Sequence, residues 1–362
     1  MTKKTRLVFV ALVSFVLAVA LAGFFFFNQL LQRPMSSDQT EILFDVSPGA
    51  TLSQVSQELQ QKGLIRNSKA FQFYAKSQGL ASQLKVGEYA LSKNMSPDAM
   101  LAVLVSGKSV ARAVTIAEGL NIFDVAEIFE KNKIGTREEF LQLVRDPIFI
   151  RSLLGEDLPS LEGYLFPETY KVTKFEGTRS VIAQMVKRFL SVWGEFEAQA
   201  QQKNWSRHKV ITFASIVEKE TGASFERPLV SSVFHNRLQK NMRLQTDPTV
   251  LYGMAMKMGR MPTNITKSDL LTPTPYNSYT NAGLPPTPIA NPGRAAIAAT
   301  LNPEPSKYIY FVSQNNGTHV FSETLEQHNR AVQQYQLNAK ARENKSWRDL
   351  KEKENKPAQS NQ

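Results

Sequence analysis

The chain of 362 residues is long enough for two or three domains with cores of their own. Its 42% apolar and 21% charged residues are typical of a globular protein and exclude a disordered chain, except at the C-terminal tail. The absence of cysteine excludes disulfides, a thiol nucleophile, thiolate metal ligands and a lipoprotein attachment site, while the net charge of +11 favours anionic partners.

The N-terminal segment is uncharged from Leu7 to Leu31, which exceeds the ~20 apolar residues that span a bilayer. Basic residues precede it at positions 3, 4 and 6, so the positive-inside rule predicts a cytoplasmic N-terminus and export of the chain after Arg33. Residues 1–33 are therefore expected to form a cytoplasmic tip and a transmembrane anchor. Nucleic acid is excluded as a partner on the exported side, which leaves the membrane surface and acidic glycans.

A cleaved signal peptide is the competing interpretation, because small residues in Ala18-Val-Ala20 and Ala20-Leu-Ala22 resemble cleavage sites. Cleavage there would leave the four aromatic residues from Phe24 to Phe27 near a free terminus, whereas an anchor buries them in lipid. The aromatic run favours an uncleaved anchor.

Residues 41–110 have the pattern of a compact strand-helix-helix-strand module. "EILFDV" alternates as a strand, and apolar residues at helical spacing follow the turn at Pro48-Gly49. "SKAFQFYAKSQG" predicts a second helix, "LKVGEYALS" a returning strand, and "SPDAMLAVLVSGK" a further helix with Pro97 at its first position.

Residues 111–152 repeat the first half of this module. Gly119 falls where Gly49 was, and the apolar positions of the first helix are matched by Ile122, Val125 and Phe129. The repetition predicts a second strand-helix unit or connector, against the alternative of chance agreement between two amphipathic helices.

Residues 153–336 predict a larger mixed domain and give the whole chain an α+β fold. It is expected to contain a helix from Arg179 to about Gln202, a helix around "ITFASIVEKETG", a loop from Thr272 to Gly293, a helix from Pro292 to Leu301, and a hairpin of "KYIYFVS" and "HVFS" turning at Asn316-Gly317. Residues 337–362 carry mixed charge with few apolar residues, which predicts a disordered tail. The four histidines lack ligand spacing, so neither a metal nor a cofactor is expected.

Glu218 and Glu220 stand two positions apart in the apolar run "ITFASIVEKETG". On a helix they point about 200° apart, so they cannot act as a carboxylate pair and at most one faces a given cleft. Glu218 stacks above Ala214, while Glu220 lies on the other flank beside Phe213. The periodicity does not choose between them, and a solvated surface glutamate is the simpler reading of each.

Five segments in this order resemble the membrane-anchored endolytic murein transglycosylase family: "LEGYLFPETY", "ASIVEKET", "LQTDPTVLYGM", "YNSYTNAGLPPTPIANPGRAAIAATLNP" and "YIYFVSQNNGTHVFSETLEQHN". The resemblance covers essentially the whole chain and implies a LysM-like module near residues 41–110 and a catalytic domain on the periplasmic side of the bacterial inner membrane. It implies that Glu218 is the catalytic residue.

The resemblance also implies non-hydrolytic cleavage of the β-1,4 bond between N-acetylmuramic acid and N-acetylglucosamine. One glutamate then acts first as acid and then as base, and a 1,6-anhydro ring forms. A hydrolase instead needs two carboxylates.

The residues expected to contact the glycan strand lie in three of the quoted segments: Gln245, Asp247, Tyr279, Asn281 and Glu162, with Tyr276 as a stacking face. Two of them have plain structural alternatives, since Asp247 before a proline is typical of a helix cap and Asn281 of a turn. Peptidoglycan and the membrane are the expected partners, with peptidoglycan synthases as further candidates. The alternative function is a non-catalytic wall-binding anchor that recruits synthases.

Overall fold

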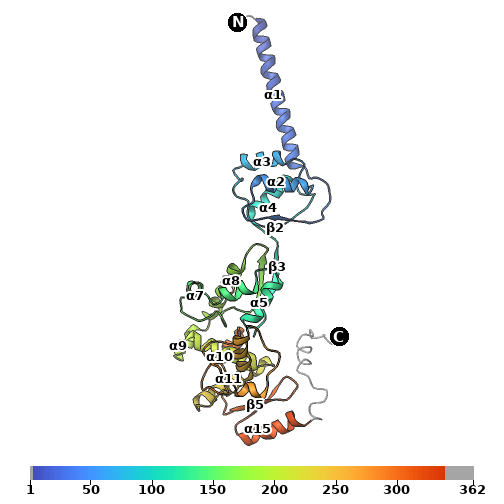
Figure 1. Cartoon of the computed structure of the whole chain (residues 1–362). Coiled ribbons are helices and arrows are strands. Elements are labelled where there is room, and N and C mark those ends of the chain that lie inside the picture. Colours follow the sequence, from blue (N-terminus) through green and yellow to red (C-terminus); the bar gives the residue numbers. More distant parts are fainter. Residues whose placement is uncertain (1–2, 339–362) are drawn as a thin grey trace, which may run out of the picture. The chain divides into compact units, whose positions relative to one another are not determined.

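The computed structural model describes residues 3–338 and divides the chain into two compact units. The first unit comprises residues up to Ala113 together with Lys171–Glu176, and the second comprises Val114–Tyr170 and the residues from Gly177 onward. The predicted disordered tail from 339 to 362 lies outside the described residues. The fold is mixed α and β, as expected (Figure 1).

The first unit begins with the long helix α1 (Lys3–Gln32). Its apolar part, Leu12–Gln32, has a mean hydropathy of 2.0 and is long enough to cross a membrane. Length and composition alone fit a membrane anchor and a signal sequence equally well.

A strand-helix-helix-strand arrangement follows α1, in the order predicted from the sequence. It consists of β1 (Ile42–Val46), α2 (Leu52–Gln61), α3 (Ser68–Ser77) and β2 (Gly87–Leu91), and is completed by α4 (Pro97–Ser106). The strands pair antiparallel from Ile42↔Leu91 to Val46↔Gly87. The apolar positions at helical spacing in α2 and α3 pack with the inward residues of both strands into one core.

The next strand-helix segment repeats the local structure of β1–α2. β3 (Ala111–Thr115) leads into α5 (Ile122–Lys131), and Gly119 has φ +77° where Gly49 has +78°. Both helices begin with a capping box, formed by Thr51 in α2 and Asn121 in α5. The strands have different partners, since β1 pairs with β2 and β3 pairs with β4 (Thr169–Thr173).

The second unit is mostly helical. It contains, in chain order, α5, α6 (Arg137–Leu143), α7 (Pro147–Leu154), α8 (Thr178–Trp193), α9 (Glu197–Gln202), α10 (Arg207–Glu220), η1 (Ser224–Glu226), α11 (Arg227–Gln239), α12 (Asp247–Met258), α13 (Lys267–Leu271) and α14 (Arg294–Leu301). The hairpin of β5 (Tyr310–Ser313) and β6 (His319–Ser322) follows, then α15 (Leu325–Val332) and η2 (Gln333–Leu337).

The single helix predicted from Arg179 to Gln202 is in fact two, α8 and α9. The chain turns at Gly194, and Phe196 is buried before α9 begins. Glycine is a poor helix former, and the burial of the Phe196 ring stabilises the bend between α8 and α9. The long loop after α13 carries no helix or strand between Thr272 and Gly293, as predicted.

Helix α10 is the centre of the second unit. It packs against α9, α11, α12 and α14, and every residue from Val210 to Glu218 is buried. The expected apolar stripe is therefore the middle of a helix enclosed on all sides, and only the two ends of α10, at Arg207–Lys209 and at Lys219–Glu220, have exposed surface.

Candidate active site

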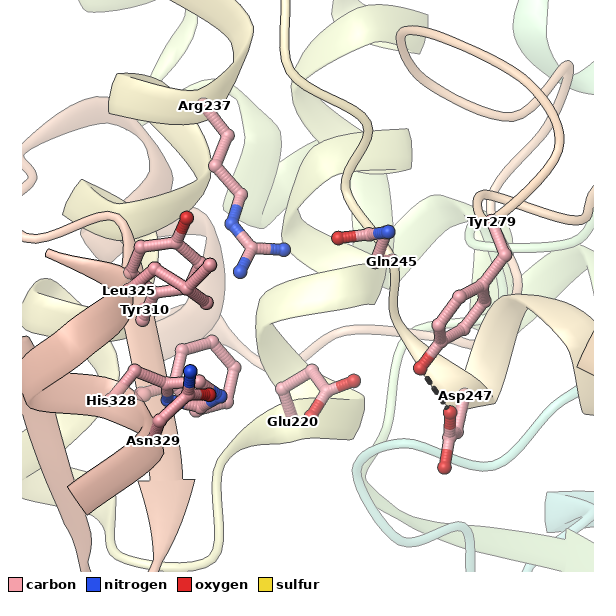
Figure 2. A pocket seen from close by; sticks show the side chains of 10 residues that line it. Glu220, Arg237, Gln245, Asp247, Tyr279, Tyr310, Leu325, His328 and Asn329 are labelled. Atoms are coloured by element: carbon pink, nitrogen blue, oxygen red, sulfur yellow. Dashed lines mark hydrogen bonds between the residues drawn. The ribbon is translucent and has the colours of Figure 1, made fainter. Parts of the chain in front are cut away.

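A cavity of about 490 Å³ opens at the C-terminal end of α10. Figure 2 shows Glu220 between two groups of side chains, with Gln245, Asp247 and Tyr279 on one side and the β5 and α15 residues on the other. The lining residues are Glu220, Arg237, Gln245, Asp247, Tyr279, Tyr310, Phe311, Leu325, His328 and Asn329. The cavity thus combines a helix end, a loop and a hairpin that are far apart in the sequence.

Glu220 is half-buried and accepts a hydrogen bond from the Thr246 hydroxyl. Burial raises the pKa of Glu220 above its ordinary value, and the nearby Asp247 charge raises it further. The Thr246 hydrogen bond, and more weakly His319 and Arg237, oppose this shift without cancelling it. A carboxyl group in such surroundings retains its proton to higher pH than usual, as a general acid requires.

The polar wall is built on the start of α12. The Tyr279 hydroxyl donates to Asp247 Oδ1 at 2.6 Å, and burial raises the pKa of Tyr279 so that it stays protonated. Gln245 has φ +50°, in the left-handed region that non-glycine residues rarely adopt. Its neighbour Thr246 is held there by a backbone hydrogen bond to the Ser278 hydroxyl at 2.9 Å. Strain of this kind, held by surrounding contacts, is common at functional sites.

The opposite wall is aromatic. The rings of Tyr310 and His328 stack 5.1 Å apart, and the Arg237 guanidinium lies 5.5 Å from the Tyr310 ring. Arg237 joins two segments, because Nε donates to the Ile309 carbonyl and Nη1 to the Leu244 carbonyl. Burial, followed by the charge of Arg237, lowers the pKa of His328 and favours its neutral form.

A pair of contacts between His319 and Glu226 connects the hairpin to the start of α11. His319 Nδ1 lies 2.7 Å from Glu226 Oε2, and the His319 backbone N–H donates to Oε1 of the same carboxylate at 3.0 Å. Both side chains are nearly buried, so the contact fixes the hairpin to the start of α11.

Glu218 faces a different part of the second unit and is absent from the cavity lining. Its Oε1 accepts from Arg227 Nη2 at 2.9 Å, and its Oε2 accepts from the Gly293 backbone N–H at 3.1 Å. Arg227 Nη2 also donates to Glu118 Oε2 at 3.3 Å. Burial, and after it the charge of Glu218, raises the pKa of Glu118. Glu218 therefore joins the end of α10 to the first residues of α11 and α14.

The comparisons with known proteins agree on one family. A model described as the YceG-like family matches residues 44–334. The chain belongs to the YceG-like family. It is 33% identical over 331 residues to a protein of Bacillus subtilis named endolytic murein transglycosylase, a match that covers 87% of this chain and 91% of that protein.

Other relatives of this YceG-like chain extend the comparison. A protein of the same name from Streptococcus pneumoniae is 29% identical over 360 residues, covering 89% of this chain and 64% of that longer protein. A crystal structure described as a YceG-like protein from Listeria monocytogenes is 34% identical, with a TM-score of 0.56, and the match covers 81% of this chain and 99% of that one.

The structure places Glu162 of this YceG-like chain in the core rather than along a groove. Its exposed fraction is 0%, and its Oε2 accepts from the Ile122 backbone N–H at 3.0 Å at the start of α5. The pKa of Glu162 is raised to about 8, mainly by burial and to a smaller extent by the Asp124 charge, although hydrogen bonds from Ile122 and Tyr252 act in the opposite direction. A side chain without exposed surface does not reach a glycan, so the expected substrate contact of Glu162 finds no support here.

Asn281 and Tyr276 also turn away from the cavity. The Asn281 side chain donates to the carbonyls of Thr274 and Asn277, which closes the turn considered as its structural alternative. The Tyr276 ring meets that of Tyr252 edge-on at 5.0 Å, and its hydroxyl lies 2.9 Å from that of Thr287. Both residues shape the loop that carries Tyr279.

Gln245, Asp247 and Tyr279 are the predicted site residues that the structure brings together in the cavity. Sequence reasoning missed Arg237, Tyr310 and His328, which have no local pattern that marks them. It also considered Glu220 and set it aside. No group of histidine, aspartate and glutamate suited to a metal ion occurs among the described residues.

Proposed function

We propose that this chain is a lytic transglycosylase that cleaves the bond between N-acetylmuramic acid and N-acetylglucosamine within peptidoglycan strands, and that the cavity at the end of α10 is its active site. The observation that carries the proposal is the cavity itself, in which a carboxyl group of raised pKa faces polar and aromatic walls. The names of the relatives from Bacillus and Streptococcus support the substrate class.

The geometry favours Glu220 over Glu218 as the catalytic carboxyl. Glu220 lines the cavity, whereas both oxygens of Glu218 are engaged by Arg227 and Gly293. An acid must lie within reach of the proton acceptor on the substrate. The role of Glu218 implied by the resemblance stays a prediction, and variants of the two residues decide between them.

In the proposed reaction Glu220 first donates its proton to the leaving oxygen O4 of N-acetylglucosamine, and the bond from C1 of N-acetylmuramic acid to O4 breaks. The Glu220 carboxylate then accepts the proton of the muramyl 6-hydroxyl while O6 attacks C1. A 1,6-anhydro ring forms, the carboxyl group regains its proton, and no water is consumed. One residue performs both proton transfers.

Asp247 is the residue that an alternative, hydrolytic mechanism would use. It is a second carboxylate in the cavity, and hydrolytic glycosidases use two. Asp247 accepts a hydrogen bond from the Tyr279 hydroxyl, and we therefore give it the role of holding the polar wall in place. If products with reducing muramic acid ends dominate, water is the nucleophile and Asp247 becomes the candidate base.

The test is mass spectrometry of the products released from purified sacculi by the wild-type chain and by the Glu220→Gln and Glu218→Gln variants. The proposal requires anhydro-ended products from the wild type and their loss in Glu220→Gln, with sacculus binding retained. Binding without any cleavage by the wild-type chain would instead support the non-catalytic anchor that recruits synthases.

We also propose that α1 is an uncleaved anchor in the bacterial inner membrane, with a cytoplasmic N-terminus and a periplasmic catalytic unit. Sequencing the N-terminus of membrane-extracted protein tests this, and a mature chain that starts near Gly23 would overturn it.

The module from β1 to α4 has the element order of a LysM-like glycan-binding domain, and we assign it the role of holding glycan strands. Its deletion should weaken sacculus binding and leave the cleavage of short soluble glycans intact. Loss of both would contradict the assignment.

A further inference from the structure

The end of helix α1 is packed into the small module rather than separated from it by a free linker. Helix α1 contacts α3 and α4, and Leu31 in its last turn is 4% exposed. The rings of Phe27 and Phe73 meet edge-on with their centroids 5.4 Å apart. Phe27 belongs to the apolar segment Leu12–Gln32, so Phe73 lies level with the end of that segment.

The chain that leaves α1 is fixed to the same module. Arg66 donates to the carbonyls of Arg33 and Pro34 at 3.1 and 3.0 Å. The backbone N–H of Ser36 donates to the Lys93 carbonyl at 3.1 Å. These contacts hold α3 in one place beside the end of α1.

Helix α3 presents a basic and aromatic face to solvent. Lys69, Phe73 and Lys76 are spaced i, i+4 and i+7, and all three are exposed, with Phe73 at 64%. On the other face Phe71 and Ala75 are buried in the module core. Helix α3 has no acidic residue, and neither lysine has an ion-pair partner among the residues that the structure describes.

We propose that this face of α3 is a membrane-contact surface that lies on anionic lipid headgroups, with Phe73 inserted at the boundary of the bilayer where α1 emerges. The inference rests on the proposed anchoring of α1. Its consequence is that the small module is held flat on the membrane surface instead of moving freely at the end of a linker.

Three observations select a bilayer as the occupant of this face. Aromatic rings are enriched at membrane interfaces, and the contact with Phe27 places Phe73 at that depth. Lysine side chains flanking such a ring can keep their ammonium groups among phosphates while their stems cover apolar surface. Unpaired positive charge next to an anchor is attracted to an acidic leaflet.

The chain contains no cysteine, so a single introduced cysteine reports one position without background. The experiment places a nitroxide label at Phe73→Cys, and separately at exposed Ser77→Cys, in the full-length chain reconstituted into phosphatidylcholine nanodiscs with or without phosphatidylglycerol. Electron paramagnetic resonance then compares collisions of each label with lipid-soluble oxygen and with a water-soluble nickel chelate.

Lys108→Cys is the matched control. Lys108 is exposed, and the hydroxyl of its neighbour Ser109 donates to the Glu88 carbonyl near the Gly87 end of β2. The chain that leaves α1 is bonded instead beyond the opposite end of β2, where Ser36 donates to Lys93. Lys108 therefore lies at the end of β2 away from the anchor.

We expect oxygen collisions to exceed nickel collisions at positions 73 and 77, and the reverse at 108. The double variant Lys69→Gln, Lys76→Gln should increase nickel collisions of the label at 77 and abolish its response to phosphatidylglycerol. Phe73→Ser should increase the nickel collisions of this label in both lipid mixtures.

Labels at 73 and 77 that are as accessible to nickel as the label at 108 would overturn the proposal. A label at 77 that responds to neither lysine nor Phe73 substitution would also do so. N-terminal sequencing of the reconstituted chain separates this failure from that of the anchor, because a chain cleaved within α1 refutes anchoring itself.

Discussion

Two regions at the end of α10 place two glutamates in opposite surroundings. Around Glu218, an arginine and a backbone N–H occupy both carboxylate oxygens, and the side chain is 5% exposed. Around Glu220 the carboxyl group has one hydroxyl partner and faces a cavity. The first region joins three helices, and the second leaves an acid facing a space that a substrate can enter.

The difference shows that burial alone does not make a glutamate an acid. Glu162 illustrates the remaining case, since it is fully buried with a raised pKa yet has no surface toward a ligand. A general acid needs the raised pKa and the access together.

The strongest test of the comparison is Glu220→Gln. Gln preserves the size of the side chain and removes the proton to be donated, so the rate of anhydro-product release from sacculi should fall on the order of 10²-fold or more. Glu218→Gln, assayed in parallel as folded protein, should fall less than about tenfold. The reverse order would return the catalytic role to Glu218.

Glu162→Gln tests, through the free energy of unfolding, a carboxyl group that is buried without access to a ligand. The folded pKa of Glu162, about 8, lies above its ordinary value of 4.5. The stability linked to its proton is therefore complete below pH 4.5 and is lost as the pH rises toward 8. Between pH 4.5 and 7 the wild type should lose about 3 kcal/mol of unfolding free energy relative to Glu162→Gln.

Urea titrations at several pH values measure this difference. Exposed Glu127→Gln on α5 is the matched control and should follow the wild-type pH dependence. Parallel pH dependences of the wild type and Glu162→Gln would show that the carboxyl is not protonated on folding.

Glu218→Gln should lower the free energy of unfolding by about 2 kcal/mol, because one charge-assisted hydrogen bond to Arg227 or Gly293 is weakened in a buried place. Chemical denaturation measures the loss. The control is Glu195→Gln, which breaks the exposed pair with Arg294 and should cost less than about 1 kcal/mol. Equal effects of the two variants would contradict the structural role of Glu218 in joining α10 to α11 and α14.

Asp247→Asn tests the electrostatics of the open cavity. The charge of Asp247 contributes to the raised pKa of Glu220, so its removal should lower that pKa. Since the acid acts protonated, the alkaline limb of the pH profile of kcat/KM should move to lower pH. A limb that stays in place would mean that another group sets it.

Much of the fold follows from local patterns. The βααβ order, the paired turns at Gly49 and Gly119, and the loop after Thr272 were predicted from turn residues and apolar spacing and appear in the structure. The predicted helix from Arg179 to Gln202 was wrong because the core burial of Phe196 at the break is a tertiary effect. Of the cavity lining, Gln245, Asp247 and Tyr279 are residues that the family resemblance singled out, and their contact with glycan stays a prediction.

The sequence by itself determined the apolar N-terminal helix, the order of the elements in the small module, the family, and the fact that Glu218 and Glu220 point apart. Only the tertiary structure decided which of the two meets a cavity. The reason is that the middle of α10 is buried on every face, so its apolar pattern does not indicate which face meets solvent. The direction of each carboxyl was set by what folds against it: Arg227 and Gly293 close around Glu218, while the hairpin and the loop before α12 leave space beside Glu220.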